Sequence, residues 1–322
     1  MLLVYYLVLV NIAAFILYGS DKSSAVKEVR RIPERTLLFW AWIGGSIGAF
    51  AAMKFFHHKT RKPKFALVVP VLVIMELIII GLCLFQNYYL TKTEYEADIG
   101  LRYELTVVQV SDLHNQFFGI KQSVLLKQIK DTDPDMIVVT GDIVDSTHTS
   151  YTIALDFIEG AVEIAPVYYV SGNHENRLKG EKLDEFYSKM RDLGVIFVDD
   201  TYDETKEYIV AGIADSSLDG FDAYEAFDDS KPVIMLAHEP QYADLYKSLG
   251  ADIVFTGHFH GGQIIIPGVG GLISPEFDIL PKPYEGMYDY DGMTVVLSRG
   301  LGNSIAPVRI NNYPELVVVK LH

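Results

Sequence analysis

Five short apolar runs, rich in β-branched residues, each end directly in a patch of Asp, Asn, His or Gly. The runs are Leu105–Val110, Met136–Thr140, Val167–Ser171, Val233–Ala237 and Ile253–Thr256. Short apolar runs bounded by turn residues are typical of buried strands in an α/β fold. Helical spacing in Gln122–Lys130 and Lys182–Leu193 fits this alternation. Because ligands of open α/β sheets gather outside the carboxyl ends of the strands, we expect the five patches to meet in one cleft.

The residue types in these patches are carboxylate, amide oxygen and imidazole, without thiolate, which suit divalent cations. The patches are Asp112-Leu113-His114, Gly141-Asp142-Ile143-Val144-Asp145, Gly172-Asn173-His174-Glu175, His238 and Gly257-His258-Phe259-His260. Five of the nine histidines of the chain lie in them. The period of two in Asp-x-His and His-x-His points both side chains of a pair to one side of an extended strand end. These patterns predict a metal site.

The two parts of the chain differ in charge. Residues 1–90 contain 10 Lys and Arg against 4 Asp and Glu, and residues 91–322 contain 17 against 38. Since nucleic acids are bound through clusters of Lys and Arg, the acidic part argues against nucleic acid as a partner. It is compatible with a site that concentrates cations. The single cysteine, Cys83, excludes a disulfide within the chain.

Three apolar segments precede the acidic part: Leu2–Tyr18, Thr36–Phe56 and Phe65–Phe85. Their lengths approach or reach the roughly 20 residues that cross a bilayer. We therefore expect a three-helix transmembrane domain over residues 1–90, a linker over 91–103 and a catalytic domain over 104–322. One alternative is a secretory signal peptide, although the first segment has no basic start and no small-residue cleavage site. Another is a set of buried helices in a soluble domain.

Two basic loops separate the three apolar segments. The first contains Lys22, Lys27, Arg30, Arg31 and Arg35, and the second contains Lys59, Arg61, Lys62 and Lys64. If all three segments cross the membrane, the loops face opposite sides and the positive-inside rule gives a conflicting answer. The uncharged residues 86–89 after the third segment favour a cytoplasmic second loop and an extracytoplasmic catalytic domain. Within that segment Glu76 is either functional or a protonated carboxyl bonded to a neighbouring helix.

The five patches, taken in order, resemble the calcineurin-like metallophosphoesterase superfamily over about residues 104–320. Gly257–Ile266, 298–303 and 307–310 look like its bacterial membrane-associated branch, which includes enzymes acting on envelope or lipid-type phosphoesters. Motifs within residues 1–85, such as Tyr18–Lys22 and Gly44–Ala49, resemble a small bacterial three-helix membrane family of unknown function. The resemblance implies an α/β fold in which two mixed β-sheets pack as a sandwich flanked by helices.

Carried over residue by residue, the resemblance implies two divalent metal ions. One would be held by Asp112, His114, the bridging Asp142 and His260, and the other by Asp142, Asn173, His238 and His258. His174 would face the substrate as a general acid, and Asp145 would orient it. The two ions would clamp a phosphate and activate a water. Manganese is favoured, and iron and zinc also suit such ligands.

These inferences predict a membrane-anchored, metal-dependent phosphoesterase. The expected substrate is a phosphoester or pyrophosphate, in the lipid-linked or cell-envelope class that includes UDP-diacylglucosamine-like compounds and phospholipids. The sequence leaves the choice between monoester, diester and pyrophosphate open. Two alternatives also remain open: a metal-binding regulatory scaffold, and a membrane transporter domain with an attached phosphoesterase.

Overall fold

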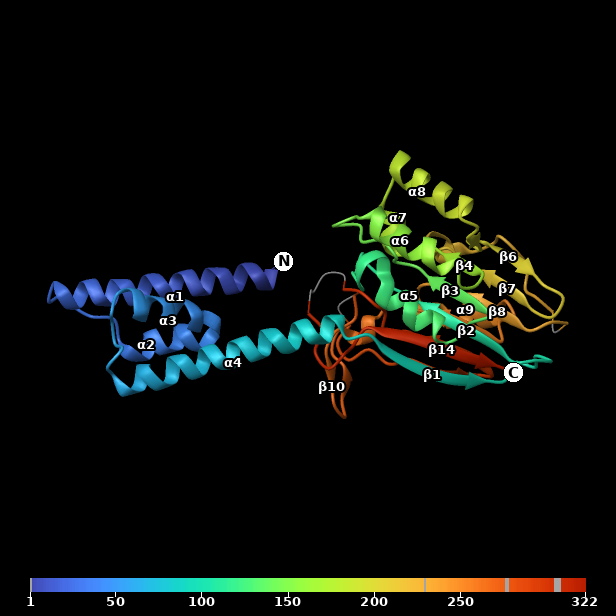
Figure 1. The fold of residues 1–322 in the computed structure, drawn as a ribbon. Coiled ribbons are helices and arrows are strands. Elements are labelled where there is room, and N and C mark those ends of the chain that lie inside the picture. Colours follow the sequence, from blue (N-terminus) through green and yellow to red (C-terminus); the bar gives the residue numbers. More distant parts are fainter. Residues whose placement is uncertain (1, 229, 276–277, 304–307) are drawn as a thin grey trace. The chain divides into compact units, whose positions relative to one another are not determined.

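The computed structural model describes residues 2–228, 230–275, 278–303 and 308–322. Pro307, the first residue of one motif compared above, lies outside the described residues. The chain divides into two compact units, Met1–Phe85 and Gln86–His322 (Figure 1).

The second unit contains two six-stranded sheets within the described residues. The first sheet has the order β1 (Thr91–Ala97), β14 (Glu315–Leu321), β2 (Leu105–Val110), β3 (Met136–Thr140), β4 (Val167–Val170) and β5 (Ile196–Phe197). The second has the order β12 (Gly286–Tyr290), β13 (Met293–Leu297), β9 (Ile253–Thr256), β8 (Val233–Leu236), β7 (Ile209–Gly212) and β6 (Thr201–Glu204). Each sheet mixes parallel and antiparallel pairs. The strands β10 (Ile265–Ile266) and β11 (Gly270–Gly271) form a separate short antiparallel pair.

The two sheets pack face to face, with helices on their outer faces. Side chains such as Val107 of β2 and Phe255 of β9 fill the space between the sheets. The outer face of the first sheet packs against α5 (Ser123–Lys130), α6 (Tyr151–Ala161) and α8 (Glu181–Asp192), and that of the second packs against α9 (Ala243–Ser248). Since both faces are covered, the central strands are buried along their whole length. The α/β class with mixed sheets is confirmed.

Residues 91–103 are not the linker that the sequence predicted. β1 pairs in parallel with β14 along its whole length, from Thr91 to Ala97. Half-buried and exposed residues alternate in it, as in a strand with one face on the core. Its charged residues, Lys92, Glu94 and Glu96, take the exposed positions. The first sheet therefore begins before the predicted start of the catalytic domain.

The first unit is helical. It contains α1 (Leu2–Val26), α2 (Glu34–Trp40), η1 (Ala41–Gly45), α3 (Ser46–Phe55) and, up to Phe85, α4 (Pro63–Tyr88). By length and composition, two helical stretches among the described residues could cross a membrane: Glu34–Phe55, 44% buried, and Pro63–Tyr88, 11% buried. The three predicted spans are thus found as helical segments, whereas three crossings of a membrane stay a prediction. Within Glu34–Phe55 the backbone leaves helical geometry at Gly44, where φ is 100°.

Candidate metal centre

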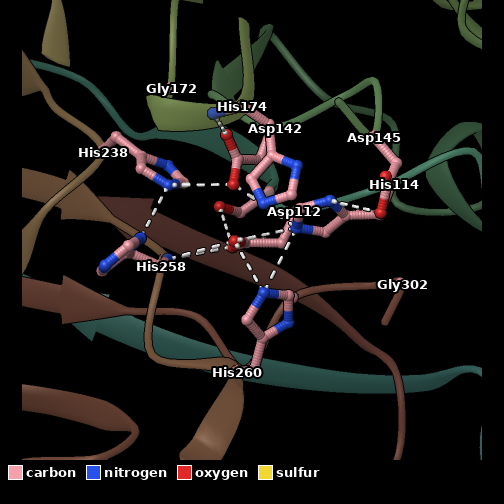
Figure 2. Close-up of polar contacts among 12 residues, drawn as sticks. Asp112, His114, Asp142, Asp145, Gly172, His174, His238, His258, His260 and Gly302 are labelled. Carbon is pink, nitrogen blue, oxygen red and sulfur yellow. Dashed lines mark hydrogen bonds and ion pairs between the residues drawn. The ribbon is translucent and has the colours of Figure 1, made fainter. Parts of the chain in front are cut away.

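The five sequence patches meet at the carboxyl ends of their strands (Figure 2). The predicted metal ligands and His174 lie on the loops after β2, β3, β8 and β9 and at the start of α7 (Asn173–Arg177), which follows β4. Seven of these side chains belong to residues no more than 6% exposed: Asp112, His114, Asp142, His174, His238, His258 and His260. The convergence that the sequence predicted is therefore present in the structure.

Within the described residues, the ligand atoms fall into three clusters, each with its atoms within 4.8 Å of one another. They are Asp112-His114-His260, Asp142-His238-His258 and His114-Asp142-His174. The Asp142 Oδ2 atom lies 3.4 Å from His114 Nε2 and 3.3 Å from His238 Nε2. One carboxylate thus stands between the first two clusters. The third cluster includes His174, which the resemblance left outside the metal ligands.

The donor set fits divalent cations. The Nε2 atoms of His114 and His260 face each other at 3.2 Å, and His238 Nε2 lies 3.1 Å from His258 Nδ1. The buried Asn173 Oδ1 accepts no hydrogen bond from any described residue. A buried carbonyl oxygen without a donor is costly unless a cation or water satisfies it. Converging nitrogen and oxygen atoms of this kind suit Mn, Fe or Zn.

The charge state differs from group to group in the centre: burial opposes protonation of His114 and His238, but the facing carboxylates raise the pKa of both imidazoles. Burial opposes ionisation of Asp142, but the facing His238, bonded to it, and His114 hold its pKa well below the usual range. Burial lowers the pKa of His260 to about 3 and that of His174 to about 4. At neutral pH these two imidazoles are therefore neutral, and a neutral imidazole keeps a lone pair for a metal or a proton.

Several residues of the centre hold a left-handed backbone. Positive φ angles occur at Asp112 (51°), His114 (44°), Asp142 (53°), His258 (69°) and His260 (47°). Such conformations cost on the order of 1–3 kcal/mol each in a non-glycine residue and cluster at functional sites. Backbone hydrogen bonds hold them, among them His114 N to Asp142 O at 2.9 Å. The fold thus stores local strain to aim these side chains inward.

Glu175 braces the loop that carries Asp142. Its Oε2 accepts hydrogen bonds from Asp142 N and Gly172 N, both at 2.8 Å, and its Oε1 accepts one from Val144 N at 3.1 Å. Burial, together with the charge of Asp142, raises the pKa of Glu175 to about 7. The sequence analysis assigned it no role. A signal was present, because a Glu three residues after a helix N-cap often bonds back to the cap.

His174 is held by Ser146. The Ser146 backbone N–H donates to His174 Nδ1 at 3.0 Å, so the neutral ring carries its proton on Nε2. Asp145, the predicted orienting residue, accepts from the backbone and hydroxyl of Thr147, and its Oδ2 lies 3.9 Å from His114 Nδ1. The hydrogen bond to His174 Nδ1 thus comes from Ser146, the chain neighbour of Asp145. A catalytic role for Asp145 stays a prediction.

Arg309 holds the backbone of the centre; the sequence analysis included it in the motif 307–310 but gave it no role. Its guanidinium, fully buried, donates to Gly302 O at 2.5 Å and to Asn312 Oδ1 at 3.3 Å. Gly302 N in turn donates to Asp112 O, and Asn312 Nδ2 donates to His260 O, both at 2.6 Å. One arginine thereby connects the backbones of two candidate ligands. No local pattern distinguishes such an arginine from an exposed one.

Two family models match the chain. Residues 105–262 match the model described as Calcineurin-like phosphoesterase, and this match coincides with the strands and loops of the metal centre. This region is a calcineurin-like metallophosphoesterase domain. Residues 11–65 match a family described as Protein of unknown function (DUF1294). The resemblance that the sequence suggested is confirmed for the catalytic domain, and the chain is a metal-dependent phosphoesterase.

Bacterial metallophosphoesterases are among its relatives. The chain is 29% identical over 228 residues to the metallophosphoesterase YkuE of Bacillus subtilis, covering 67% of this chain and 78% of that protein. It is 24% identical over 225 residues to YkoQ of the same species, covering 67% and 83%. It is 26% identical over 194 residues to the phosphodiesterase YaeI of Escherichia coli, covering 58% and 70%.

Proposed function

We propose that the chain is a membrane-anchored phosphoesterase that uses two divalent cations. The observation that carries this proposal is the position of Asp142 between two clusters of metal-ligand atoms. One ion would be bound by Asp112, His114, Asp142 and His260, and the other by Asp142, Asn173, His238 and His258. Manganese is favoured, with iron and zinc compatible with the same nitrogen and oxygen donors.

The residues of the domain supply the remaining chemistry. Divalent cations bound here would neutralise phosphate charge and activate a water for attack on phosphorus. His174 accepts from Ser146 at Nδ1 and therefore holds its proton on Nε2. From there the neutral ring can donate a hydrogen bond to the leaving oxygen, and once it has gained a second proton it can transfer one to that oxygen as a general acid. Asp145, whose own hydrogen bonds order the loop that carries Ser146, would keep His174 in this orientation.

We propose a lipid-linked or cell-envelope phosphoester as the substrate, in the class of UDP-diacylglucosamine-like compounds or phospholipids. The similarity to the phosphodiesterase YaeI favours a diester within this class. The membrane part is supported by α4, which has 26 residues and exposes apolar side chains such as Leu67, Ile78 and Leu82. A catalytic domain tethered by such a helix would meet its substrates at a bilayer surface.

The catalytic domain would lie outside the cytoplasm in this proposal. The support is the charge asymmetry of α4: basic residues, among them Lys62 and Lys64, lie at its start and uncharged residues 86–89 at its end. Basic residues flanking a span tend to stay in the cytoplasm.

Metal loading of the full chain tests the proposal. The detergent-purified protein would be stripped with a chelator, reloaded with Mn, Fe or Zn, and assayed on an aryl phosphodiester. We expect about two equivalents of metal per chain and metal-dependent hydrolysis. Asp142→Asn should lose both, whereas the exposed control Asp291→Asn should keep both. Absence of binding for all three metals, or two equivalents retained in Asp142→Asn, would refute the two-metal assignment.

A further inference from the structure

The two ends of the second apolar segment lie side by side. Glu34 Oε1, at the start of α2, lies 3.4 Å from Lys59 Nζ, which follows α3, and it also pairs with Lys62. A straight helix over the 22 residues Glu34–Phe55 would hold its ends about 33 Å apart. The segment must therefore turn back on itself.

Contacts with α1 show the direction of each arm. The Tyr18 hydroxyl donates to Leu37 O in α2 at 3.3 Å, and Asn11 Nδ2 donates to Gly44 O at 2.7 Å. The helix α2 therefore runs antiparallel to α1. The α3 arm then runs forwards beside α1, from the Asn11 contact with Gly48 towards Phe56. Figure 1 shows both arms beside α1.

The segment α2–η1–α3 forms a helical hairpin, and side chains of α1 satisfy the backbone at its turn. The Asn11 side chain bonds to the backbone before and after the turn: its Nδ2 donates to Gly44 O, and its Oδ1 accepts from Gly48 N at 2.6 Å. The Tyr6 hydroxyl donates to Ile43 O at 2.8 Å. A Cβ on Gly48 would lie 2.0 Å from the Asn11 carbonyl oxygen, so only glycine allows this approach. In a bilayer, non-helical backbone is tolerated only where protein groups satisfy it in this way.

A contact with α4 completes the enclosure of the hairpin. The Ser46 hydroxyl, at the start of α3, donates to the Glu76 carboxyl of α4. Of the two alternatives for Glu76, the structure thus shows the carboxyl bonded to a neighbouring helix.

Both basic loops converge on Asp21, near the end of α1. This carboxylate, fully buried, accepts from Arg31 of the first loop at 2.8 Å. It also lies 2.7 Å from His58 Nε2 and 3.1 Å from Lys59 Nζ of the second loop. A buried carboxylate with several cationic partners holds these loops together, because breaking such a cluster would leave a charge uncompensated. The two loops therefore lie at the same end of the helical unit.

We propose that residues 1–85 cross the lipid bilayer twice, through α1 and α4, and that Glu34–Phe55 is a re-entrant hairpin inserted from the cytoplasmic side. The 25-residue helix α1 thus takes the place of Glu34–Phe55, one of the two candidate spans named above, as a crossing helix. Ten residues separate Glu34 from Gly44, a helical rise of about 15 Å, which reaches the middle of a hydrocarbon core about 30 Å thick. With both basic loops on one face, the positive-inside rule no longer conflicts with itself and places both in the cytoplasm. The inference rests on the membrane part of the proposed function and is independent of the phosphoesterase chemistry.

Apolar side chains on the two crossing helices support a lipid environment. On α1 the exposed residues include Leu9, Ile12 and Ile16, and on α4 they include Ile74 and Leu77. An apolar surface of this extent is unusual on a soluble unit and fits acyl chains.

Cysteine labelling in intact cells tests the topology. The single native cysteine would be removed by Cys83→Ser in the full chain, and one new cysteine added at an exposed position by Lys27→Cys, Arg61→Cys or Arg102→Cys. A membrane-impermeant maleimide would be applied before and after permeabilisation. Hydrolysis of an aryl phosphodiester would confirm that each variant is folded.

The re-entrant topology predicts that K27C and R61C both react only after permeabilisation, whereas R102C reacts in intact cells. Three crossings predict instead that K27C and R61C lie on opposite sides, and that result would overturn the hairpin. K27C and R61C reacting in intact cells, with R102C protected, would overturn the cytoplasmic assignment. Active protein in the soluble fraction would overturn membrane insertion while leaving the phosphoesterase assignment intact.

Discussion

Gly172→Ala should displace the shared carboxylate by a calculable amount. A Cβ at position 172 would lie 2.4 Å from Asp142 Oδ1 and 2.7 Å from Asp142 N. Ordinary contact begins at 3.4 Å, so the oxygen must move by about 1 Å. The backbone of Gly172, with φ −106° and ψ −176°, is open to any residue, so the effect is purely steric.

A movement of this size has different consequences for the fold and for the site. Overpacking of this kind costs about 1–3 kcal/mol in the free energy of unfolding. A catalytic site tolerates about 0.5 Å, and a misplacement of about 1 Å can cost about 100-fold in rate. We therefore expect a metal-free protein that is still folded, with weakened metal binding and a loss of about 100-fold in kcat/KM.

Manganese titration by calorimetry and turnover of an aryl phosphodiester would measure both effects. Gly81→Ala is a matched control, because a Cβ there meets nothing within 4 Å. It should leave both readouts unchanged. If Gly172→Ala bound manganese and turned over substrate like the control, the bridging position given to Asp142 would be wrong.

Three further predictions address other parts of the catalytic unit. His174→Ala should retain metal, measured by elemental analysis, and lose about 10²- to 10⁴-fold in turnover as a general acid is removed; undiminished turnover would exclude that role. Arg309→Met should lower the free energy of unfolding in urea by roughly 1–3 kcal/mol, because the buried Gly302 carbonyl loses a donor; an unchanged midpoint would contradict this. Burial raises the pKa of Asp199 to about 6, so the folded state favours its protonated form and wild-type stability should fall as pH rises from about 4 to 7. Asp199→Asn keeps an oxygen for the Ser171 N–H and should flatten this part of the stability–pH curve, with a gain of up to about 3 kcal/mol at pH 8; curves of the same shape would refute the assignment.

Much of the catalytic fold could be predicted because its signals are local. The bounds of β2, β3 and β9 coincide with the predicted Leu105–Val110, Met136–Thr140 and Ile253–Thr256. These strands are buried on both faces, so their sequences are continuous apolar runs that end sharply at polar residues. The edge strand β1 was missed, since it is half exposed and its pairing with β14 joins segments more than 200 residues apart.

In the metal centre too, features with local sequence signals could be predicted and features that depend on long-range packing could not. The candidate ligands could be found because carboxylate, amide and imidazole side chains appear directly after strands, and strand ends at one edge of a sheet are neighbours. The residues that hold the centre in place could not be found in this way. Ser146 reaches His174, and Arg309 reaches the loop beside Asp112, through contacts that depend on how distant segments pack.

The sequence by itself determined the order of strands and polar patches, the ligand chemistry and the apolar character of the first 85 residues, because each depends on residue type and short spacing. Only the tertiary structure decided which carboxylate stands between the clusters and that the second apolar segment folds back. An apolar stretch of 22 residues has the same composition whether it runs straight or turns at Gly44. The difference lies in what Asn11 and Asp21 contact across the chain, and those contacts exist only once the helices are packed.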